Sequence, residues 1–159
     1  WSSTALSRTL LKVLEWSDVV SGVTHNHPEA LASAQAAALS VSWARNKVPA
    51  GEIRSRISNR FGYDLDTPIE TIRASYVRTE RAKDSVPQAV TCALQASSFE
   101  DAIRSAVSIG GDSDTIAAIA GGIAEAMFGL PEEIARQAWA YLPEDMQGVV
   151  NDFYSAKTP

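Results

Sequence analysis

The stretch GGDSDTIAAIAGGIAEAMF at residues 110–128 gives the strongest structural signal in the chain. Its apolar residues recur at steps of three and four, and after Asp114 its only charged residue is Glu125. This spacing predicts a helix from about Ser113 to Phe128, and a helix that is apolar on nearly every side lies at the centre of a protein. The two glycines before it let the chain end one helix and turn tightly into the next.

Helical periodicity continues on both sides of this stretch, and no segment shows the alternating pattern of a β-strand. Thr67 with Glu70 fits a capping box that starts a helix, and Ser85 and Ser98 give related start signals. The expected helical segments are Leu6–Leu14, Pro28–Val41, Pro49–Gly62, Thr67 onward, Ser85 onward, Ser98 onward, Ser113–Phe128, Pro131–Leu142 and Pro143–Ser155. We therefore expect a single compact all-α domain over residues 1–159, with roughly eight helices.

The composition excludes several classes of function. Lys and Arg number 14 against 19 Asp and Glu, which gives a net charge of -5 and argues against electrostatic binding to DNA, RNA or an anionic membrane. The single Cys92 excludes an intramolecular disulfide and a multi-cysteine zinc site. No apolar run approaches the roughly 20 residues that span a bilayer and no signal peptide is visible, so we expect a cytoplasmic protein. The chain begins at Trp1 instead of Met, which indicates a processed chain or a piece of a longer one.

The segment that opens the central helix carries the clearest chemistry. Asp112 is expected at or near the N-cap, with Asp114 and Thr115 in the first turn, so that two carboxylates and a hydroxyl meet at one buried helix end. Like charges repel there unless a cation or a proton intervenes, and an all-oxygen set suits a hard cation, Mg²⁺ first and Mn²⁺ or Ca²⁺ next. The alternative is structural, because Asp is common at helix starts, where it caps free N–H groups.

Both histidines stand in the segment Val23–Glu29, at the entry to the helix that begins at Pro28. A His-x-His pair can bind zinc, but no third ligand of the right type is near in the sequence. We expect instead that His25 and Asn26 donate to a phosphate or a ribose hydroxyl beside the helix N-terminus. The structural alternative is that His27 or Asn26 caps the helix and that His25 packs, and for His27 we favour the cap.

Other candidate residues give weaker signals. The most polar long connection, Tyr76–Asp84, is a candidate surface or site loop. Cys92 falls on the apolar stripe of its helix with no base nearby, which indicates a buried structural thiol. The sequence contains no nucleophile elbow, P-loop or dinucleotide fingerprint.

Four motifs occur in a fixed order along the chain. They are THNHPEA at residues 24–30, SVPQA at 85–89, FEDAI at 99–103 and AVSIGGDSDTIAAIAGGIA at 106–124. Together they resemble the ADP-ribosylglycohydrolase family, which is related to dinitrogenase reductase-activating glycohydrolase. The last match is too long to arise by chance, and the resemblance covers about Val20 to Leu142.

The resemblance implies an all-α orthogonal bundle that binds two Mg²⁺ ions, or Mn²⁺, and cleaves the bond between ADP-ribose and a protein side chain or small acceptor. Three positions match the family's metal ligands: Asp112, Asp114 and Thr115. His25 matches a histidine of the ADP-ribose pocket, and Ser85 and Val86 fall near the residues that line the distal ribose.

The family's N-terminal motifs are absent from this sequence. They are an early Gly-Asp segment, a Thr-Asp-Asp-Thr-like metal segment and a Gly-Asn-Gly-rich segment before a Met-Arg, and they supply the other metal ligands and the acidic group expected to act as the catalytic base. We therefore expect the C-terminal portion of a family member, incomplete at its N-terminus, that carries about half of the site and shows little hydrolysis alone.

Two alternatives stay open at this point. One is a catalytically inactive, truncated family member that acts as a helical binding or assembly module, as a homodimer or with a complementing N-terminal half. It predicts an exposed apolar surface. The other keeps the fold and the hydrolysis but changes the substrate to another N- or O-glycoside.

Overall fold

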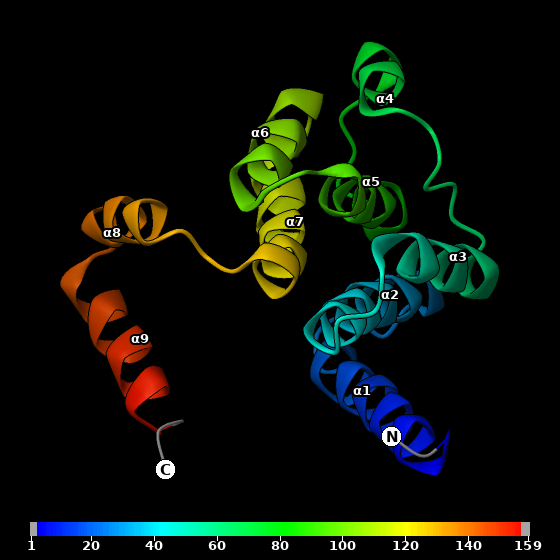
Figure 1. Cartoon of the computed structure of the whole chain (residues 1–159), viewed down its shortest axis with the longest axis horizontal. Helices are drawn as coiled ribbons and strands as arrows, with labels where there is room; N and C mark the ends of the chain where they lie inside the picture. The colour runs from blue at the N-terminus through cyan, green and yellow to red at the C-terminus, as the bar shows by residue number, and fades with distance from the viewer. Residues whose placement is uncertain (1–2, 157–159) are drawn as a thin grey trace. The chain divides into compact units, whose positions relative to one another are not determined.

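The computed structural model of the chain describes the backbone of residues 3–156 and the side chains of residues 8–156. In this described part every regular element is an α-helix; there are nine helices and no strand, which confirms the expected all-α class (Figure 1). The helices are α1 (Ser3–Gly22), α2 (Pro28–Arg45), α3 (Ala50–Phe61), α4 (Ile69–Ser75), α5 (Ala82–Gln95), α6 (Phe99–Ile109), α7 (Ser113–Phe128), α8 (Glu132–Ala140) and α9 (Glu144–Ala156).

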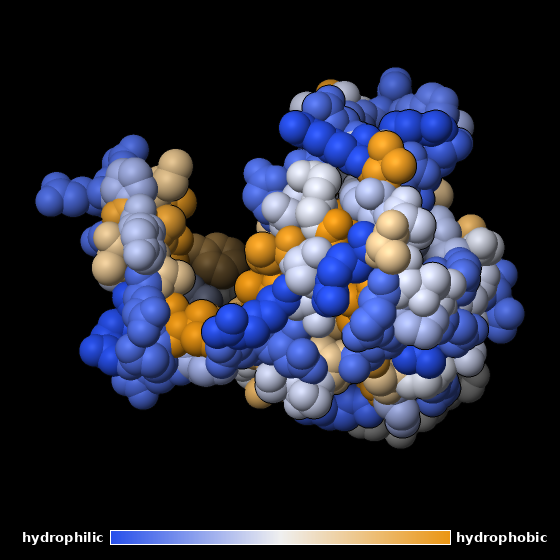
Figure 2. Space-filling view, turned by 90° about the horizontal axis from the view of Figure 1, so that it is seen from above, coloured by the Kyte–Doolittle hydropathy of each residue, from blue (hydrophilic) through white to orange (hydrophobic). Residues whose placement is uncertain are grey.

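The chain divides into two compact units, Trp1–Gly129 with α1 to α7 and Leu130–Pro159 with α8 and α9. Neither α8 nor α9 contains a buried residue, and Tyr141 and Val149 are among the exposed apolar side chains of the second unit. Figure 2 shows apolar residues, in orange, at the surface of both units. No helix in the described part of the chain combines the length and the apolar composition that crossing a bilayer requires.

The core of the first unit is built mainly from α2, α5 and α7. Leu39, Val90 and Ile123, one from each of these helices, are fully buried in the same apolar cluster. Helix α5 contacts α2, α3, α4, α6 and α7 (Figure 1), and buried residues line most of its length. Removal of this apolar surface from water is the main force that holds the seven helices together.

The helix expected at the centre of the fold, α7, has one exposed side. It packs against α2, α5 and α6, and Ile116, Ala120 and Ile123 are fully buried. Ala118 and Glu125, however, are exposed. The expectation is therefore correct for the role of α7 in the core and wrong for its burial on all sides. Exposure of an Ala face costs little, because the apolar area of each side chain is small.

Several expected helix ends are confirmed. Ser98 caps α6, since its hydroxyl accepts the N–H of Asp101 at 3.1 Å. Gly62 ends α3 in the left-handed conformation with φ 72°, and its N–H donates to the carbonyl of Ser58 at 2.8 Å. Pro28 is the first residue of α2, where its missing N–H costs no hydrogen bond.

The capping box expected at Thr67 is wrong. The hydroxyl of Thr67 donates to the carboxylate of Asp64 at 2.6 Å, and Asp64 also accepts the N–H groups of Asp66 and Thr67. Pro68 holds the N-cap position of α4, and no side chain caps this helix. The Thr67 hydroxyl, which the capping box requires as an acceptor, is bound instead to the carboxylate of Asp64.

The helix start expected at Ser85 is also wrong, because α5 begins at Ala82 and contains Pro87. The N–H groups of Asp84 and Ser85 both donate to the carbonyl of Arg81, at 2.9 and 3.2 Å, so the first turn forms ahead of the proline. The earlier start matters for the site, since it places the end of the polar connection in the first turn of a fixed helix.

Candidate functional site

The turn between α6 and α7 places the acidic side chains. Gly110 and Gly111 have φ values of 80° and 67°, a region that favours glycine. Asp112 follows as the N-cap of α7, as the sequence predicts, and its carbonyl accepts the N–H of Ile116 at 3.1 Å. Its side chain makes no capping hydrogen bond, so the carboxylate is not used to hold the helix end.

We call Asp112, Asp114 and Thr115 the acidic cluster. Asp112 is half-buried and the other two residues are exposed, so the expectation of a buried helix end is wrong. At a surface both carboxylates keep water, which removes the cost of burying two like charges. The pKa of Asp114 is lowered first by the N–H of Thr115, then by a hydrogen bond with the Asp112 carboxyl group and by its own N–H, and to a lesser extent by the charge of Arg78.

The donor set of the acidic cluster fits a hard cation in kind. Carboxylate and hydroxyl oxygens are the ligands that Mg²⁺ prefers, and it takes about six of them in near-octahedral geometry. Among the residues that the structure describes, no group of three or more His, Cys, Asp or Glu side chains is placed to hold a metal ion. The acidic cluster therefore offers part of a coordination sphere and not the whole of it.

The loop at residues 76–81, between α4 and α5, packs onto the glycine turn. A Cβ atom on Gly111 would lie 2.7 Å from Cε1 of Tyr76 and 3.3 Å from Cα of Arg78. No side chain fits there without a shift of the loop, and the positive φ disfavours one as well. The glycine turn thus fixes the loop beside the acidic cluster.

Tyr76 brings an unused polar group to this place. Its hydroxyl is buried and has no hydrogen-bond partner among the described residues. Burial raises the pKa of Tyr76, and the negative charges of Asp84 and Asp112 raise it further. From the sequence, Tyr76 stands out as the first residue of the polar connection and, because it lies near a loop, as a weak candidate for stacking; its buried hydroxyl has no sequence signal.

A cavity of about 610 Å³ joins segments that are far apart in the sequence. Five of the predicted site residues line it: His25, Ser85, Val86, Asp112 and Thr115. The sixth, Asp114, is not among the lining residues. The cavity is also lined by His27, Glu29, Ala30, Glu80, Arg81, Ala82, Lys83 and Ile119.

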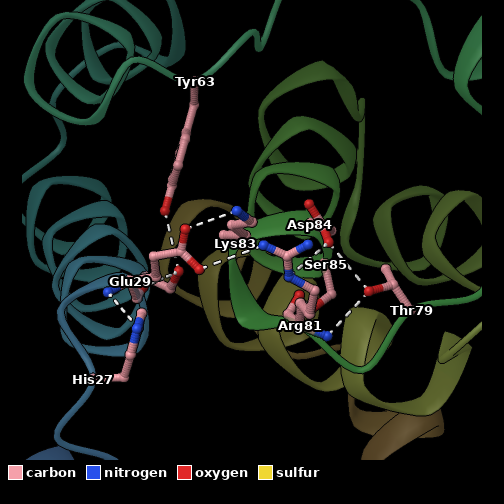
Figure 3. A network of polar contacts seen from close by, with 9 residues as sticks. His27, Glu29, Tyr63, Thr79, Arg81, Lys83, Asp84 and Ser85 are labelled. Atoms are coloured by element: carbon pink, nitrogen blue, oxygen red, sulfur yellow. Dashed lines mark hydrogen bonds and ion pairs between the residues drawn. The ribbon is translucent and has the colours of Figure 1, made fainter.

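One side of this cavity carries a cluster of charged side chains (Figure 3). Oε1 of Glu29, in the first turn of α2, accepts a hydrogen bond from Nζ of Lys83 at 2.7 Å, and Oε2 lies 3.6 Å from Nη2 of Arg81. We call Arg81 and Lys83 the cationic pair. The pKa of Glu29 is lowered, first by the hydrogen bond from Lys83 and then, against the opposing effect of desolvation, by the charges of both cations.

The end of the loop is fixed to α5 by a second set of contacts. The hydroxyl of Thr79 donates to Oδ2 of Asp84 at 3.1 Å and accepts the N–H of Arg81 at 3.1 Å (Figure 3). Nε of Arg81 lies 3.7 Å from the same Asp84 oxygen. These contacts hold Arg81 beside the first turn of α5, which carries Lys83.

The sequence model of the ADP-ribosylglycohydrolase family matches residues 4–158. The chain belongs to this family. A comparison with curated proteins gives no match. Membership of the ADP-ribosylglycohydrolases agrees with the all-helical fold and assigns the chain to a family of hydrolases.

The two histidines of this ADP-ribosylglycohydrolase family member have different surroundings. Nδ1 of His27 accepts the N–H of Glu29 at 3.3 Å at the start of α2, which confirms the interpretation of His27 as a cap. His25 is exposed and does not pack; its Nδ1 lies 2.8 Å from the hydroxyl oxygen of Thr24. A role of His25 in binding ADP-ribose stays a prediction.

Ser85 and Val86 are buried, at 3% and 4% exposure, and border the cavity with little surface. The Ser85 hydroxyl donates to the carbonyl of Arg81 at 3.2 Å, so it is occupied within α5. Contact of either residue with a ribose stays a prediction. Cys92, further along α5, is fully buried, and burial raises the pKa of its thiol to about 12, as expected for a structural thiol.

The contact between Glu29 and the cationic pair is the part of the site that sequence reasoning missed. The sequence marks both segments, THNHPEA as a motif and Tyr76–Asp84 as a polar connection. It does not predict the contact between them, because Glu29 and Lys83 are 54 positions apart and such a contact has no local sequence pattern.

Proposed function

We propose that this chain carries part of the site of an enzyme that hydrolyses the N- or O-glycosidic bond between ADP-ribose and a protein or small-molecule acceptor, with the help of a divalent cation. The main support is that His25, Asp112 and Thr115 line one cavity in a chain of this family. The cavity volume of about 610 Å³ lies in the range of roughly 300–1,000 Å³ that is typical of small-molecule sites.

Asp112, Asp114 and Thr115 would hold the cation through two carboxylates and one hydroxyl. A divalent cation held there, Mg²⁺ or Mn²⁺, would supply Lewis-acid chemistry for a water and the ribose hydroxyls. The chain keeps the Asp114 carboxylate ionised through the N–H of Thr115, which suits it to a cation. The exposed imidazole of His25 offers a donor to a phosphate or a ribose hydroxyl.

The acidic cluster leaves positions open in the sphere of about six oxygen ligands that Mg²⁺ takes. We propose that the remaining ligands and the general base come from groups outside this cavity. The chain by itself is therefore expected to bind ADP-ribose and to turn over ADP-ribosyl-arginine slowly or not at all.

Calorimetric titration of ADP-ribose, with and without Mg²⁺, tests the proposal. Mg²⁺ is expected to strengthen ADP-ribose binding to the wild-type chain and to leave binding to Asp112→Ala unchanged. Glu125→Ala is the matched control, because Glu125 is an exposed carboxylate at the other end of α7. An equal response to Mg²⁺ in Asp112→Ala, or rapid turnover of ADP-ribosyl-arginine in EDTA, would contradict the proposal.

The second candidate function is a helical assembly module, with a second copy of the chain as partner. It is favoured by apolar side chains that stay exposed on α1, with Trp16 at 65% and Val20 at 68%, beside a groove of about 580 Å³ that Ala34 and Ala38 of α2 also line. Light scattering after size exclusion decides between the candidates. A monomer at high concentration excludes the homodimer, and a dimer that Trp16→Ser dissociates supports it.

A further inference from the structure

We infer that the cavity recognises the diphosphate of its ligand through the cationic pair, and that Glu29 occupies the place that a phosphate takes when the ligand binds. The inference rests on the proposed function, because it assigns the part of the cavity that faces the diphosphate of an ADP-ribosyl group. It names three residues, Glu29, Arg81 and Lys83, that the motifs of the chain leave without a role.

A single carboxylate serves two cations at this place. One oxygen of Glu29 lies 2.7 Å from Lys83 and the other lies 3.6 Å from Arg81, and all three side chains line the cavity of about 610 Å³. A phosphate, like a carboxylate, presents at least two anionic oxygens as hydrogen-bond acceptors, and guanidinium and ammonium groups bind both. The arrangement is therefore already shaped for an anionic group that presents two oxygens.

The charges favour exchange of Glu29 for a phosphate. Lys83 is 34% exposed, Glu29 47% and Arg81 60%, so all three side chains reach solvent, the ion pairs are partly screened by water, and a ligand in the cavity can approach them. Arg81 lies near the carboxylates of both Glu29 and Asp84, at 3.6 and 3.7 Å, and Lys83 contacts that of Glu29 at 2.7 Å. A diphosphate brings more than one negative charge and satisfies the pair more fully than Glu29 does.

A purely structural role for the same contact makes a different prediction. If Glu29 only ties α2 to α5, loss of either partner weakens the fold and affects all ligands alike. If the inference is right, the two losses act in opposite directions on phosphate binding. Removal of the Lys83 charge weakens it, and removal of the Glu29 charge frees the cations and strengthens it.

Calorimetry in EDTA and low salt tests this, with ADP and inorganic pyrophosphate as phosphate probes and adenosine as the probe without phosphate. We expect Lys83→Gln to weaken ADP and pyrophosphate binding about tenfold. Glu29→Gln is expected to strengthen both about threefold, and neither variant is expected to change adenosine binding. Lys83→Arg should keep most of the affinity, and Lys12→Gln, on α1 and outside this cavity, is the matched control. Far-ultraviolet circular dichroism confirms that each variant folds.

The outcomes separate this inference from the proposed function. Failure of the wild-type chain to bind ADP and pyrophosphate overturns the inference, as does a shift of Glu29→Gln and Lys83→Gln in the same direction. If pyrophosphate binds as expected but ADP-ribose does not, the cationic pair binds phosphate and the proposed function fails. If ADP-ribose binds with the expected response to Mg²⁺ and Lys83→Gln has no effect, the inference alone fails.

Discussion

The acidic cluster and the cationic pair both contribute to one cavity, but their charges are satisfied in opposite ways. Asp112 and Asp114 form no ion pair within the described residues, although the charge of Arg78 lowers the pKa of Asp114 to a small extent. Arg81 and Lys83 both contact the carboxylate of Glu29. One region therefore carries an excess of charge, and the other is largely neutralised by its own chain.

This difference indicates how each region would respond to a ligand. No ion pair within the described residues involves Asp112 or Asp114, so an added cation binds there without first displacing a cation of the protein. The cationic pair is already occupied, so an anionic ligand has to displace Glu29 and gains only the difference between the two contacts. We expect the acidic cluster to show the larger response to its ligand.

The largest expected effect comes from Gly111→Ala, which disturbs the turn that carries the acidic cluster. Its Cβ would lie 2.7 Å from the ring of Tyr76 at a φ of +67°, so the loop has to move or the backbone is strained. We expect a loss of about 2 kcal/mol in the free energy of unfolding, measured with urea.

Gly122→Ala, within α7, is the control. A Cβ at Gly122 meets nothing within 4 Å, so the substitution should stabilise the chain by about 0.5–1 kcal/mol through helix propensity. Equal effects of the two substitutions would show that the loop does not pack on the glycine turn.

Asp112→Asn tests the excess charge of the acidic cluster directly. With Mg²⁺ at about ten times its Kd, the wild-type chain should gain roughly 1.4 kcal/mol and melt about 3–6 °C higher, and the variant should show no rise. In EDTA the variant and the wild type should melt at nearly the same temperature, because both carboxylates reach solvent and their interaction is screened by water. A rise of equal size with Mg²⁺ in the variant would show that the Asp112 charge does not bind the cation.

Tyr76→Phe sharpens the comparison by removing the polar group beside the acidic cluster. The buried hydroxyl has no hydrogen-bond partner among the described residues, so its loss should leave stability unchanged or raise it by up to about 1 kcal/mol. Tyr63→Phe is the control, since the Tyr63 hydroxyl lies 3.2 Å from that of Ser33 and its loss should cost about 1 kcal/mol. Destabilisation by Tyr76→Phe of the same size as that by Tyr63→Phe would mean that the hydroxyl has a partner in solution.

The two regions also differ in how far the sequence predicted them. The acidic cluster follows from local signals: a glycine pair, an N-cap aspartate and an apolar helix, all within one short segment. The helix class and most helix ends follow from the same kind of local pattern. The start of α5 and the partner of Thr67 did not, because each depends on competition between nearby hydrogen-bond acceptors.

The cationic pair could not be predicted, because its partner stands in another helix. In the sequence, Glu29 is an ordinary acidic residue in the first turn of the helix that begins at Pro28, and Lys83 is part of a polar connection. Only the packing of α2 against α5 brings them within 2.7 Å. The prediction that the acidic cluster lies at a buried helix end was wrong for the same reason. The exposure of a turn depends on which other helices cover it, and the sequence of the turn does not show this.

The smallest expected effect is the pH dependence of the Glu29 contact. The pKa of Glu29 is lowered below its ordinary value of 4.5 in the folded chain, first by the hydrogen bond from Lys83. A lowered pKa means that the contact adds stability above the unfolded pKa and that this stability is lost as the pH falls through the folded pKa. The difference in unfolding free energy between the wild type and Glu29→Gln should therefore be small and constant from pH 7 to about pH 5, and should shrink as the pH falls below 4.5 through the lowered folded pKa. Urea denaturation at intervals of pH measures it, with Glu125→Gln as the control. A difference that does not shrink as the pH falls below 4.5 would show that the uncharged hydrogen bonds of this side chain, and not its charge, hold the cationic pair.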